Sequence, residues 1–315
     1  MTTGGDAPGM NAAIRAVVRS ALYFGFDVAG IRRGWWGLLE KDYVKLGGKD
    51  VSGIIARGGT ILKTSRCPAT KTEKGIGTVV KNLLEIAPDG LVVIGGDGSM
   101  ASASIVANRS RVPVIGIPAS IDNDIAGTDE TIGFDTAINT SLYAIDKIRD
   151  TATSHERVFI VEVMGRESGF LALNVGVASG AEIILLPEIK WKKEEVLEKL
   201  RGFKRKKLKS SLIIVMAEGA GSSALLAEYL DRETDMKVRL SNLGYIQRGG
   251  SPSVDSRILA GVFGYEAVRL LKNGKKNLMC AWVKDRFSTV PLSYSSSRKK
   301  KIDLKLLKIA GIISG

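Results

Sequence analysis

Cysteine, histidine and long apolar runs are scarce in this sequence. Only Cys67 and Cys280 occur, far apart in the chain, and they form neither a disulfide framework nor a metal-binding pattern, as is typical of a reducing compartment. The only histidine, His155, lies next to Glu156 and Arg157; such a residue is more often structural than catalytic, and we assign it no catalytic role. No apolar run approaches the roughly 18 residues of a membrane span, and the N-terminus lacks the basic-then-apolar order of a secretory signal. We therefore expect a soluble, cytoplasmic protein that does not act in a membrane.

Basic residues exceed acidic ones, with 46 Lys and Arg against 33 Asp and Glu and a formal net charge of +13. This excess favours anionic partners, either nucleic acid or phosphorylated metabolites, and does not by itself choose between them. Zinc-finger spacing and RRM-like aromatic motifs are missing from the sequence, so nucleic acid is the weaker alternative. The most basic stretch, 190–209, also carries apolar residues at helical spacing, which indicates a solvated helix face.

Glycine is abundant, with 36 residues, and short β-branched runs alternate with helical patterns. The runs that end in Gly or Pro predict buried parallel strands at 90–96, 112–118, 157–165, 181–187 and 211–219. Helices are predicted between them, one starting near Pro8 and another after Asp135. The 315 residues allow two domains of about 150 residues each. We predict an α/β protein with two doubly wound domains, mostly parallel sheets with helices on both faces, whose ligands gather at the carboxyl ends of the strands.

Two glycine loops come directly before predicted helices, in "GGDAPGMNAA" (4–13) and "GGDGSMAS" (95–102). There, backbone N–H groups and the helix dipole can meet a phosphate, although a plain tight turn would use the same glycines in the first loop. Asp97 has no apolar contact to make, and a carboxylate beside a bound phosphate is costly unless a cation lies between them. We predict Mg²⁺ held by Asp97, with Ser99 capping the next helix; an acidic turn is the alternative.

The segment "GIPASIDNDIAGTDETIGFDT" (116–136) gathers acidic residues at the end of a predicted strand. Phosphoryl transfer to a sugar hydroxyl needs one carboxylate to accept the hydroxyl proton and a second to orient metal or substrate. Asp122 and Asp124 can supply these carboxylates. The cations that cover the moving charge would come from basic residues in 62–68, 154–169 and 238–252. An Asx-rich surface loop would account for the Asn and Asp residues but not for all these segments together.

A set of ordered segments resembles the motifs of 6-phosphofructokinases of the bacterial ATP-dependent kind: GGDAPGMNAAIR, RGGTIL, GGDGS, SIDNDI, GFDTA, HERVFIVEVMGR and LGYIQRGGSP. The resemblance spans nearly the whole chain. It implies transfer of a phosphoryl group from ATP to the 1-hydroxyl of fructose 6-phosphate, a step of glycolysis. It also implies a nucleotide-binding domain of residues 1–134 plus 248–298 and a sugar-phosphate-binding domain of residues 135–247 plus 299–315.

The resemblance places catalytic groups on the acidic segment and on two arginines. Asp122 stands where the family has the base for the 1-hydroxyl proton, and Ser120 stands where the family has a threonine that contacts the transferring phosphate. Asp124 matches the second aspartate of the motif. Arg66 and Arg166 match arginines that bridge nucleotide phosphates and stabilise the transferred group. The residues implied to bind the nucleotide and its Mg²⁺ are Gly5, Arg66, Cys67, Asp97, Gly98 and Ser99.

The sugar-phosphate site implied by the resemblance is rich in arginine, which binds phosphate bidentately and stays charged. Its implied residues are Ser120, Asp122, Met164, Gly165, Arg166, Glu218, Tyr245 and Arg248, with Arg157 and Arg239 reaching in from a neighbouring subunit. Tyr245 replaces a family histidine on the 6-phosphate. Its phenol donates a hydrogen bond but adds no positive charge.

The resemblance also implies a regulatory site between subunits, which takes ADP or phosphoenolpyruvate as effector. The residues that match this pocket are Arg15, Arg19, Arg149, Lys207 and Lys209 for its cations and Glu182 for its metal-linked carboxylate. An ordinary basic surface is the alternative for Lys207 and Lys209. Together with the residues that cross between subunits, this predicts an allosteric homotetramer built from two-fold interfaces.

ATP is the predicted phosphoryl donor because Gly98 and Ala119 stand where pyrophosphate-using relatives have Asp and Lys. Glycine leaves room for the α-phosphate of ATP, whereas an aspartate would collide with it and repel it. A pyrophosphate-dependent relative remains an alternative. A lipid or NAD kinase would share GGDG but not the SIDND, MGR and QRGG segments together.

The family begins with a β-strand that leads into the first glycine loop, whereas this sequence begins Met1-Thr2-Thr3 directly at that loop. We therefore expect the first strand to be missing, which would expose two strand edges of the sheet. A second hypothesis follows from this expectation: an N-terminally truncated, weakly active chain or a non-catalytic sugar-phosphate-binding subunit.

Overall fold

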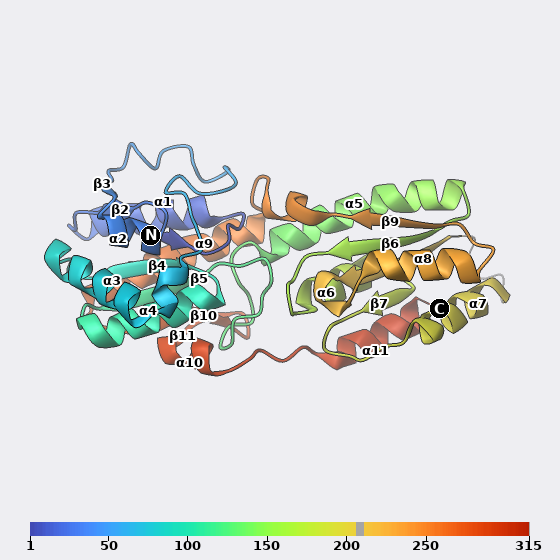
Figure 1. Cartoon of the computed structure of the whole chain (residues 1–315). Helices are drawn as coiled ribbons and strands as arrows, with labels where there is room; N and C mark the ends of the chain where they lie inside the picture. Colours follow the sequence, from blue (N-terminus) through green and yellow to red (C-terminus); the bar gives the residue numbers. More distant parts are fainter. Residues whose placement is uncertain (206–210, 315) are drawn as a thin grey trace. The chain divides into compact units, whose positions relative to one another are not determined.

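The computed structural model describes residues 1–205 and 211–314. The chain divides into two compact units: unit 1 is Met1–Thr136 with Arg248–Lys300, and unit 2 is Ala137–Gln247 with Lys301–Gly315. The elements, many of which are labelled in Figure 1, are in chain order β1 Thr2–Thr3, α1 Met10–Tyr23, β2 Ala29–Ile31, α2 Trp35–Glu40, β3 Tyr43–Lys45, η1 Pro68–Lys71, α3 Glu73–Ile86, β4 Leu91–Gly95, α4 Asp97–Ser110, β5 Val114–Pro118, α5 Phe134–Ser154, β6 Val158–Val163, α6 Phe170–Ala178, β7 Ile183–Leu185, α7 Lys193–Arg205, β8 Leu212–Ala217, η2 Glu218–Ala220, α8 Ser223–Glu233, β9 Val238–Asn242, η3 Gly244–Arg248, α9 Val254–Lys272, β10 Leu278–Val283, β11 Arg286–Pro291, α10 Leu292–Ser297 and α11 Leu304–Ile313.

Unit 1 contains a five-stranded sheet in the order β1-β4-β5-β10-β11. The pairs β1–β4, β4–β5 and β5–β10 are parallel, and β11 runs antiparallel to β10. Gly95 at the end of β4 pairs with Pro118 at the end of β5. The loops that follow these two strands therefore leave the sheet side by side at its carboxyl edge.

Helices cover both faces of this sheet, as two successive residues of β10 demonstrate. Met279 and Cys280 point to opposite faces because side chains alternate along a strand. Met279 lies in one apolar cluster with Met100 and Ala103 of α4. The Cys280 thiol instead donates to the carbonyl of Phe263 in α9, at 3.7 Å. Since α3 and α10 pack on α4 and α1 packs on α9 (Figure 1), the doubly wound arrangement expected for this unit is confirmed.

The expected absence of a first strand is wrong. Thr2–Thr3 form β1, which pairs in parallel with Ile94 and Gly95 of β4. The two side chains of β1 are buried, and the hydroxyl of Thr2 donates to the carbonyl of Lys63 at 2.9 Å. A strand of two residues is therefore enough to hold the start of the first glycine loop at the edge of the sheet.

An apolar cavity of about 440 Å³ lies beside Met1 in unit 1. Its walls include Val18 of α1, Ile31 of β2 and Val92 of β4. The amine of Met1 donates to the carbonyl of Val92 at 2.9 Å, and burial lowers the pKa of this amine to about 5. The edge of β4 that β1 leaves uncovered thus borders this apolar cavity.

Unit 2 contains a four-stranded sheet in the order β7-β8-β6-β9, in which all pairs are parallel. Alternate residues of its strands form an apolar cluster with α7 and α8, and this cluster includes Ile160, Ile214, Met216, Leu200 and Leu230. Helix α6 packs on β7 and β8 and also contacts α11. Unit 2 therefore repeats the α/β construction of unit 1 with a smaller sheet.

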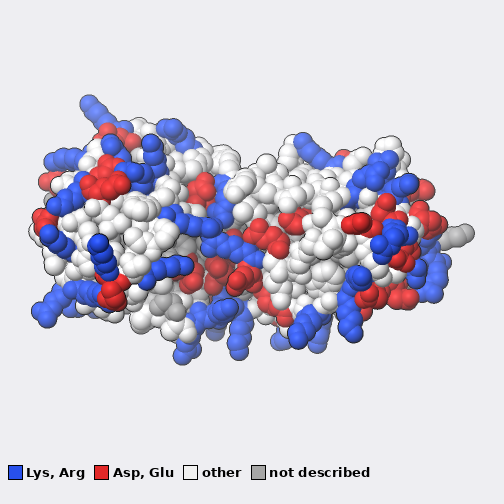
Figure 2. Space-filling view, in the orientation of Figure 1, with Lys and Arg blue, Asp and Glu red and all other residues white. Residues whose placement is uncertain are grey.

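The strands predicted at 90–96, 112–118, 157–165, 181–187 and 211–219 are β4, β5, β6, β7 and β8. Within the predicted basic stretch, α7 buries Val196, Leu197 and Leu200, so its charged residues lie on the solvated side. Figure 2 shows Lys and Arg side chains spread over the visible surface of both units and mixed with Asp and Glu. In the described ranges, no helix combines the length and the apolar character that crossing a membrane requires.

Candidate active site

Three loops of unit 1 leave the carboxyl ends of adjacent strands and contact one another. We call them the first loop (4–9), the second loop (96–98) and the acidic loop (119–133). The amide of Ala119 donates to the carbonyl of Gly95 at 2.9 Å. A Cβ added at Gly95 would lie 2.4 Å from the carbonyl oxygen of Thr3, so this close approach of the strand ends requires glycine. The candidate residues of all three loops therefore meet at one edge of the sheet.

The first loop is held by hydrogen bonds on both sides. Gly4, with a φ of 90°, donates its amide to the carbonyl of Ser65 at 3.1 Å. Arg248 donates from Nη1 to the carbonyl of Asp6 at 2.9 Å. A Cβ at Gly5 would lie 2.7 Å from the same Nη1. Arg248, which the resemblance assigns to the sugar phosphate, thus lies against the first loop within unit 1.

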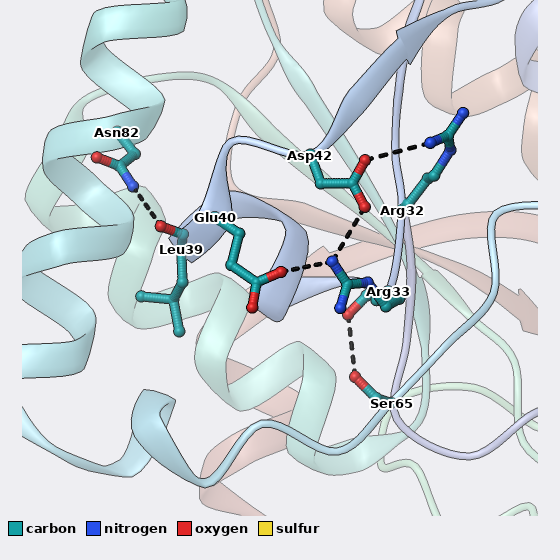
Figure 3. A network of polar contacts seen from close by, with 7 residues as sticks. All are labelled: Arg32, Arg33, Leu39, Glu40, Asp42, Ser65 and Asn82. Carbon is teal, nitrogen blue, oxygen red and sulfur yellow. Dashed lines mark hydrogen bonds and ion pairs between the residues drawn. The ribbon is translucent and has the colours of Figure 1, made fainter.

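A polar network holds the segment that carries Arg66 (Figure 3). The hydroxyl of Ser65 donates to the carbonyl of Arg33 at 3.1 Å. The guanidinium of Arg33 in turn bonds to Asp42 at 3.1 Å and to Glu40. Because Ser65 also accepts from the first loop, the network connects the Arg33 turn to that loop. Arg66 follows Ser65 directly and is exposed.

The second loop leads into the first turn of α4, where Asp97 and Gly98 are exposed. The prediction that Ser99 caps this helix is wrong. Gly96 is the N-cap residue and makes no side-chain cap, while the hydroxyl of Ser99 donates to the carbonyl of Thr3 at 3.0 Å. A Cβ at Gly98 would meet no heavy atom within 4 Å. The helix N-terminus, which favours anions, therefore opens onto free space at Gly98.

Cys67 connects to the second loop through hydroxyl groups. Thr70 donates from Oγ1 to the carbonyl of Cys67 at 2.8 Å, and Ser102 contacts Thr70 Oγ1 at 3.2 Å and donates to the carbonyl of Gly98 at 3.1 Å. Cys67 and Cys280 are both buried, and burial raises the pKa of each thiol. Cys67 therefore contributes to this region through its backbone carbonyl and through the space that its side chain fills.

The acidic loop carries its two predicted carboxylates in different surroundings. Asp122 is only 2% exposed, whereas Asp124 is half-buried. The amide of Asp122 donates to the hydroxyl of Ser120 at 3.1 Å. A Cβ at Gly96 would lie 3.8 Å from the Cβ of Ser120, in ordinary contact. The structure therefore brings Ser120 and Asp122 together beside the second loop.

The neck of the acidic loop is closed by hydrogen bonds. Thr131 donates from Oγ1 to the carbonyl of Ser120 at 2.6 Å, and the amide of Ser120 donates to the carbonyl of Ile132 at 3.0 Å. Asn123 has a φ of 51°, in the left-handed region that Asn tolerates better than most residues. The sequence reasoning did not single out Asn123 or Thr131, although Asn in a turn is a recognised signal.

In unit 2, the turn after β6 carries Met164, Gly165 and Arg166. One carboxylate oxygen of Glu218 accepts from the amides of Gly165 at 3.2 Å and of Arg166 at 2.5 Å. A Cβ at Gly219 would lie 2.0 Å from the carbonyl oxygen of Arg166. Glu218 therefore fixes the backbone of this turn, and the exposed side chain of Arg166 projects from it.

Gln247 is a residue of this region that the sequence reasoning missed. It is fully buried, and its Oε1 accepts from the hydroxyl of Ser141 at 3.1 Å and from the amide of Met164 at 3.3 Å. Its Nε2 donates to the carbonyl of Gly244 at 2.9 Å. Gln247 thus connects α5, the end of β6 and η3. Its place inside the QRGG segment was the only signal available from the sequence.

The structure does not bring Arg157 and Arg239 to the turn after β6. Arg157 comes just before β6, and Arg239 pairs with Phe159 near the start of that strand. The turn with Arg166 follows the other end of β6, and a strand of six residues spans about 20 Å. Within one chain, these two arginines therefore lie near each other and apart from the other candidate sugar-phosphate residues of unit 2.

The predicted effector residues fall into separate groups. Arg149 donates to the carbonyl of Ser179 at 2.8 Å and approaches Glu182 at 3.5 Å. The buried carboxylate of Glu182 also accepts from the amide of Ile213 at 2.6 Å. Arg15 and Arg19 lie on α1 of unit 1, and the remaining predicted residues, Lys207 and Lys209, lie outside the described residues. The pair in unit 2 is therefore the only part of this predicted pocket whose contacts the structure describes.

No three His, Cys, Asp or Glu side chains are grouped as a metal site within residues 1–205 and 211–314. Mg²⁺ is usually held in proteins by one or two carboxylates together with substrate phosphates and water. Asp97 is exposed between glycines at the opening of α4, so it offers one carboxylate where phosphates would supply the other ligands. The residues present therefore fit a Mg²⁺ ion that arrives with a nucleotide.

Comparisons with known proteins agree with the motifs. A family model described as Phosphofructokinase matches residues 1–271. The ATP-dependent 6-phosphofructokinases of Clostridioides difficile and Thermotoga neapolitana are 50% and 48% identical to this chain over 314 residues, which cover 100% of this chain and 98% of each relative. This chain therefore spans nearly the full length of both bacterial relatives.

Solved structures give the same fold. The phosphofructokinase of Saccharomyces cerevisiae matches with a TM-score of 0.87 and 33% identity, over 99% of this chain and 46% of that chain, so this chain spans less than half of the yeast chain. The pyrophosphate-dependent phosphofructokinase of Marinobacter aquaeolei matches with a TM-score of 0.86 and 24% identity, over 98% of this chain and 86% of that chain, and supports the fold alone. The phosphofructokinase-like fold expected from the sequence is confirmed, and the chain belongs to the phosphofructokinase family.

Proposed function

We propose that this protein is an ATP-dependent 6-phosphofructokinase. It transfers the γ-phosphoryl group of ATP to the 1-hydroxyl of fructose 6-phosphate and releases ADP and fructose 1,6-bisphosphate. The observation that carries the proposal is the meeting of the first, second and acidic loops at one sheet edge, where backbone-lined loops lie beside the carboxylates of Asp97 and Asp122. Relatives that share the whole chain length and carry this name support it.

The acidic loop supplies the proton acceptor in this proposal. Asp122 takes the proton of the 1-hydroxyl while the sugar oxygen forms a bond to the γ-phosphorus and the bond to the ADP oxygen breaks. Ser120, whose hydroxyl accepts from the Asp122 amide, contacts the transferring phosphate, and Asp124 orients the substrate. The burial of Asp122 keeps bulk water from competing for the proton.

The nucleotide lies on the loops of unit 1, which we propose as the nucleotide-binding domain. The first loop at Gly5 and the opening of α4 at Gly98 and Ser99 leave backbone room for phosphates, and Ser99 acts through its backbone because its hydroxyl is bound to Thr3. Arg66 neutralises the phosphates, and Cys67 packs beside the nucleotide. Asp97 would hold Mg²⁺, which when bound neutralises charge on the phosphates.

Unit 2 is proposed as the sugar-phosphate-binding domain. Arg166 projects from a turn whose backbone Glu218 fixes, and Gln247 fixes the preceding Met164. Tyr245 is 83% exposed, so its phenol is available to a ligand. Arginine is suited to this work because it binds phosphate through two parallel hydrogen bonds.

A homotetramer in the cytoplasm is the proposed working form. Arg157 and Arg239 lie at the opposite end of β6 from the turn with Arg166, so they serve the site of a neighbouring copy in this proposal. The Arg149–Glu182 pair marks one wall of an effector pocket for ADP or phosphoenolpyruvate. Arg15 and Arg19 would supply further cations of that pocket.

A coupled assay on fructose 6-phosphate, with ATP and pyrophosphate compared side by side, tests the proposal. We expect turnover with ATP and none above background with pyrophosphate. Turnover with pyrophosphate alone would overturn the choice of donor. Thermal stabilisation by fructose 6-phosphate without turnover on either donor would instead identify a non-catalytic sugar-phosphate-binding protein.

A further inference from the structure

Lys300 is a cation beside the acidic loop, and none of the proposed catalytic or binding roles involves it. It closes the part of unit 1 that follows α10, where the neighbouring Lys299 forms an antiparallel bridge with Ile125 of the acidic loop. The ammonium group of Lys300 donates to the carbonyl oxygen of Asp129 at 2.7 Å. A segment distant in sequence thus contacts the acidic loop through both its backbone and a charged side chain.

Asp129 connects Lys300 to the part of the loop that carries the carboxylates. Its carbonyl also accepts from Asn123 Nδ2 at 3.0 Å, so one oxygen atom joins Lys300 and Asn123. Asn123 lies between Asp122 and Asp124 in sequence and has a left-handed φ of 51°. The Asp129 carbonyl is therefore linked, through the side chain of Asn123, to the residue that lies between the two carboxylates.

The β10–β11 hairpin holds Asp129 from the other side. The amide of Asp129 donates to the carbonyl of Trp282 at 2.7 Å, and its carboxylate accepts from the amide of Lys284 at 2.9 Å. The amide of Trp282 donates to the hydroxyl of Thr128 at 2.9 Å. Asp129 is therefore held by hydrogen bonds with the hairpin and with Lys300, and Lys300 is the cation among these partners.

The charge of Lys300 also suits its position. The carboxylates of Asp129, Asp124 and Glu130 surround it and favour its protonated form, although burial is the larger effect and lowers the pKa of Lys300 to about 8. Lys300 in turn lowers the pKa of Glu130, which burial and the carboxylates of Asp135, Asp255 and Asp285 raise. The loop thus places several carboxylates close together, and Lys300 offsets part of their repulsion.

We propose that Lys300 is a positioning residue for phosphoryl transfer, which orients the acidic loop through the Asp129 carbonyl and offsets the negative charge around Asp124. It acts through the loop and does not touch the substrate. The proposal rests on the function proposed above. The proposal gives Lys299 and Lys300 different roles, because Lys299 contributes only its backbone to the bridge and its side chain is exposed.

The test compares Lys300→Met, Lys300→Arg and the matched control Lys299→Met. Methionine keeps most of the length and apolar bulk of lysine without the charge, and arginine restores the charge and the donor. We expect Lys300→Met to lower kcat about 10- to 100-fold with the KM for ATP nearly unchanged, since a slightly misplaced catalytic group costs rate more than binding. Lys300→Arg should recover most of the kcat, and Lys299→Met should behave as the parent.

Amide hydrogen exchange of residues 119–133 provides a readout that does not depend on turnover. We expect faster exchange in this loop for Lys300→Met than for Lys299→Met, with exchange in unit 2 unchanged. Equal exchange in the two variants, or a Lys300→Met enzyme with the kcat of Lys299→Met, would overturn the proposal. If the parent chain shows no turnover on any donor, the proposed function fails, and the exchange comparison still decides the role of Lys300.

Discussion

Gly98 in unit 1 and Gly219 in unit 2 use the small size of glycine in opposite ways. In unit 1, a Cβ at Gly98 would meet no heavy atom within 4 Å, so this glycine leaves space for something outside the chain. In unit 2, a Cβ at Gly219 would lie 2.0 Å from the carbonyl oxygen of Arg166, so this glycine leaves space for the chain itself. At these two positions glycine therefore has different uses: Gly98 leaves open space, whereas Gly219 accommodates a close backbone contact.

Two carboxylates, Glu218 in unit 2 and Asp97 in unit 1, also differ in their surroundings. Glu218 in unit 2 accepts from two backbone amides and so acts as part of the framework. Asp97 in unit 1 is exposed at the opening of α4. A carboxylate near a candidate site is thus not by itself a catalytic group, because Glu218 serves the backbone of the turn.

The largest effect is expected for substitution of Asp122. A large loss of kcat would show that unit 1 carries the proton acceptor. Asp122→Ser should lower kcat by about 100- to 10,000-fold while ATP still binds, because a positioned base acts mainly in the transition state. Steady-state kinetics and calorimetric ATP binding measure the two effects. The exposed Asp89→Ser is the matched control, and a near-parental kcat for Asp122→Ser would refute the assignment.

A second effect tests the open space at Gly98. Gly98→Asp should reduce kcat/KM for ATP by about 100-fold, because like charges brought together cost several kcal/mol. Its melting temperature should not fall, since the site is open and an acidic residue suits a helix N-terminus. Gly98→Asn separates crowding from charge. Unchanged Michaelis kinetics for ATP in Gly98→Asp would mean that the donor argument is wrong.

The matching experiment in unit 2 is Gly219→Ala. Here the added methyl group collides with backbone, so we expect a loss of about 1–3 kcal/mol in the free energy of unfolding. Gly98→Ala, measured in the same urea titration, should show almost no loss. If both alanine variants unfold at the same urea concentration, the contrast between the two glycines does not hold.

A smaller effect concerns the cavity beside Met1. An apolar segment of the type KKIGVL placed before Thr2 should raise both the melting temperature and the affinity for ATP. Such a segment can pair with β4, fill the apolar space and fix the direction of β1, whose ordering otherwise costs roughly 1–2 kcal/mol per residue. A flexible GSGSGS segment is the control. Equal melting temperatures and ATP affinities for the KKIGVL and parent chains would show that the sheet does not need it.

A further prediction is a pH dependence of stability. The buried Met1 amine has a pKa of about 5 in the folded chain against about 8 when unfolded. Between these values the unfolded chain binds the proton and the folded chain does not, so this group makes stability rise from pH 5 to pH 8. Urea titrations across this range measure it. The KKIGVL chain should lack this contribution, and an identical slope in both chains would contradict the assignment to the amine.

Much of the fold could be predicted because its signals are local. The runs at 90–96 and 112–118 are apolar and β-branched, and each ends at a glycine or proline, so β4 and β5 and the loops after them follow from the sequence. Asp122 and Asp124 could be proposed as site residues from the sequence because both lie in one short segment after a predicted strand.

The remaining features depend on partners distant in sequence. The pairing of β1 with Ile94, the bond from Ser99 to Thr3, and the contact of Lys300 with Asp129 each join segments that no periodicity connects. Gln247 is similar, because its role depends on Ser141 in another helix. Ser99 also illustrates a direct failure: its position before a helix favoured a cap, but a nearby backbone carbonyl took its hydroxyl.

The two thiols offer a practical consequence. Cys67 and Cys280 are buried and their pKa values are raised, and the thiolate is the form that attacks maleimides and methanethiosulfonates. Reagents of this kind should therefore leave the parent chain almost unlabelled under native conditions. One surface cysteine introduced into each unit would then carry a dye or spin label without first removing the native thiols, and the distance between the labels could be compared with and without added ATP and fructose 6-phosphate.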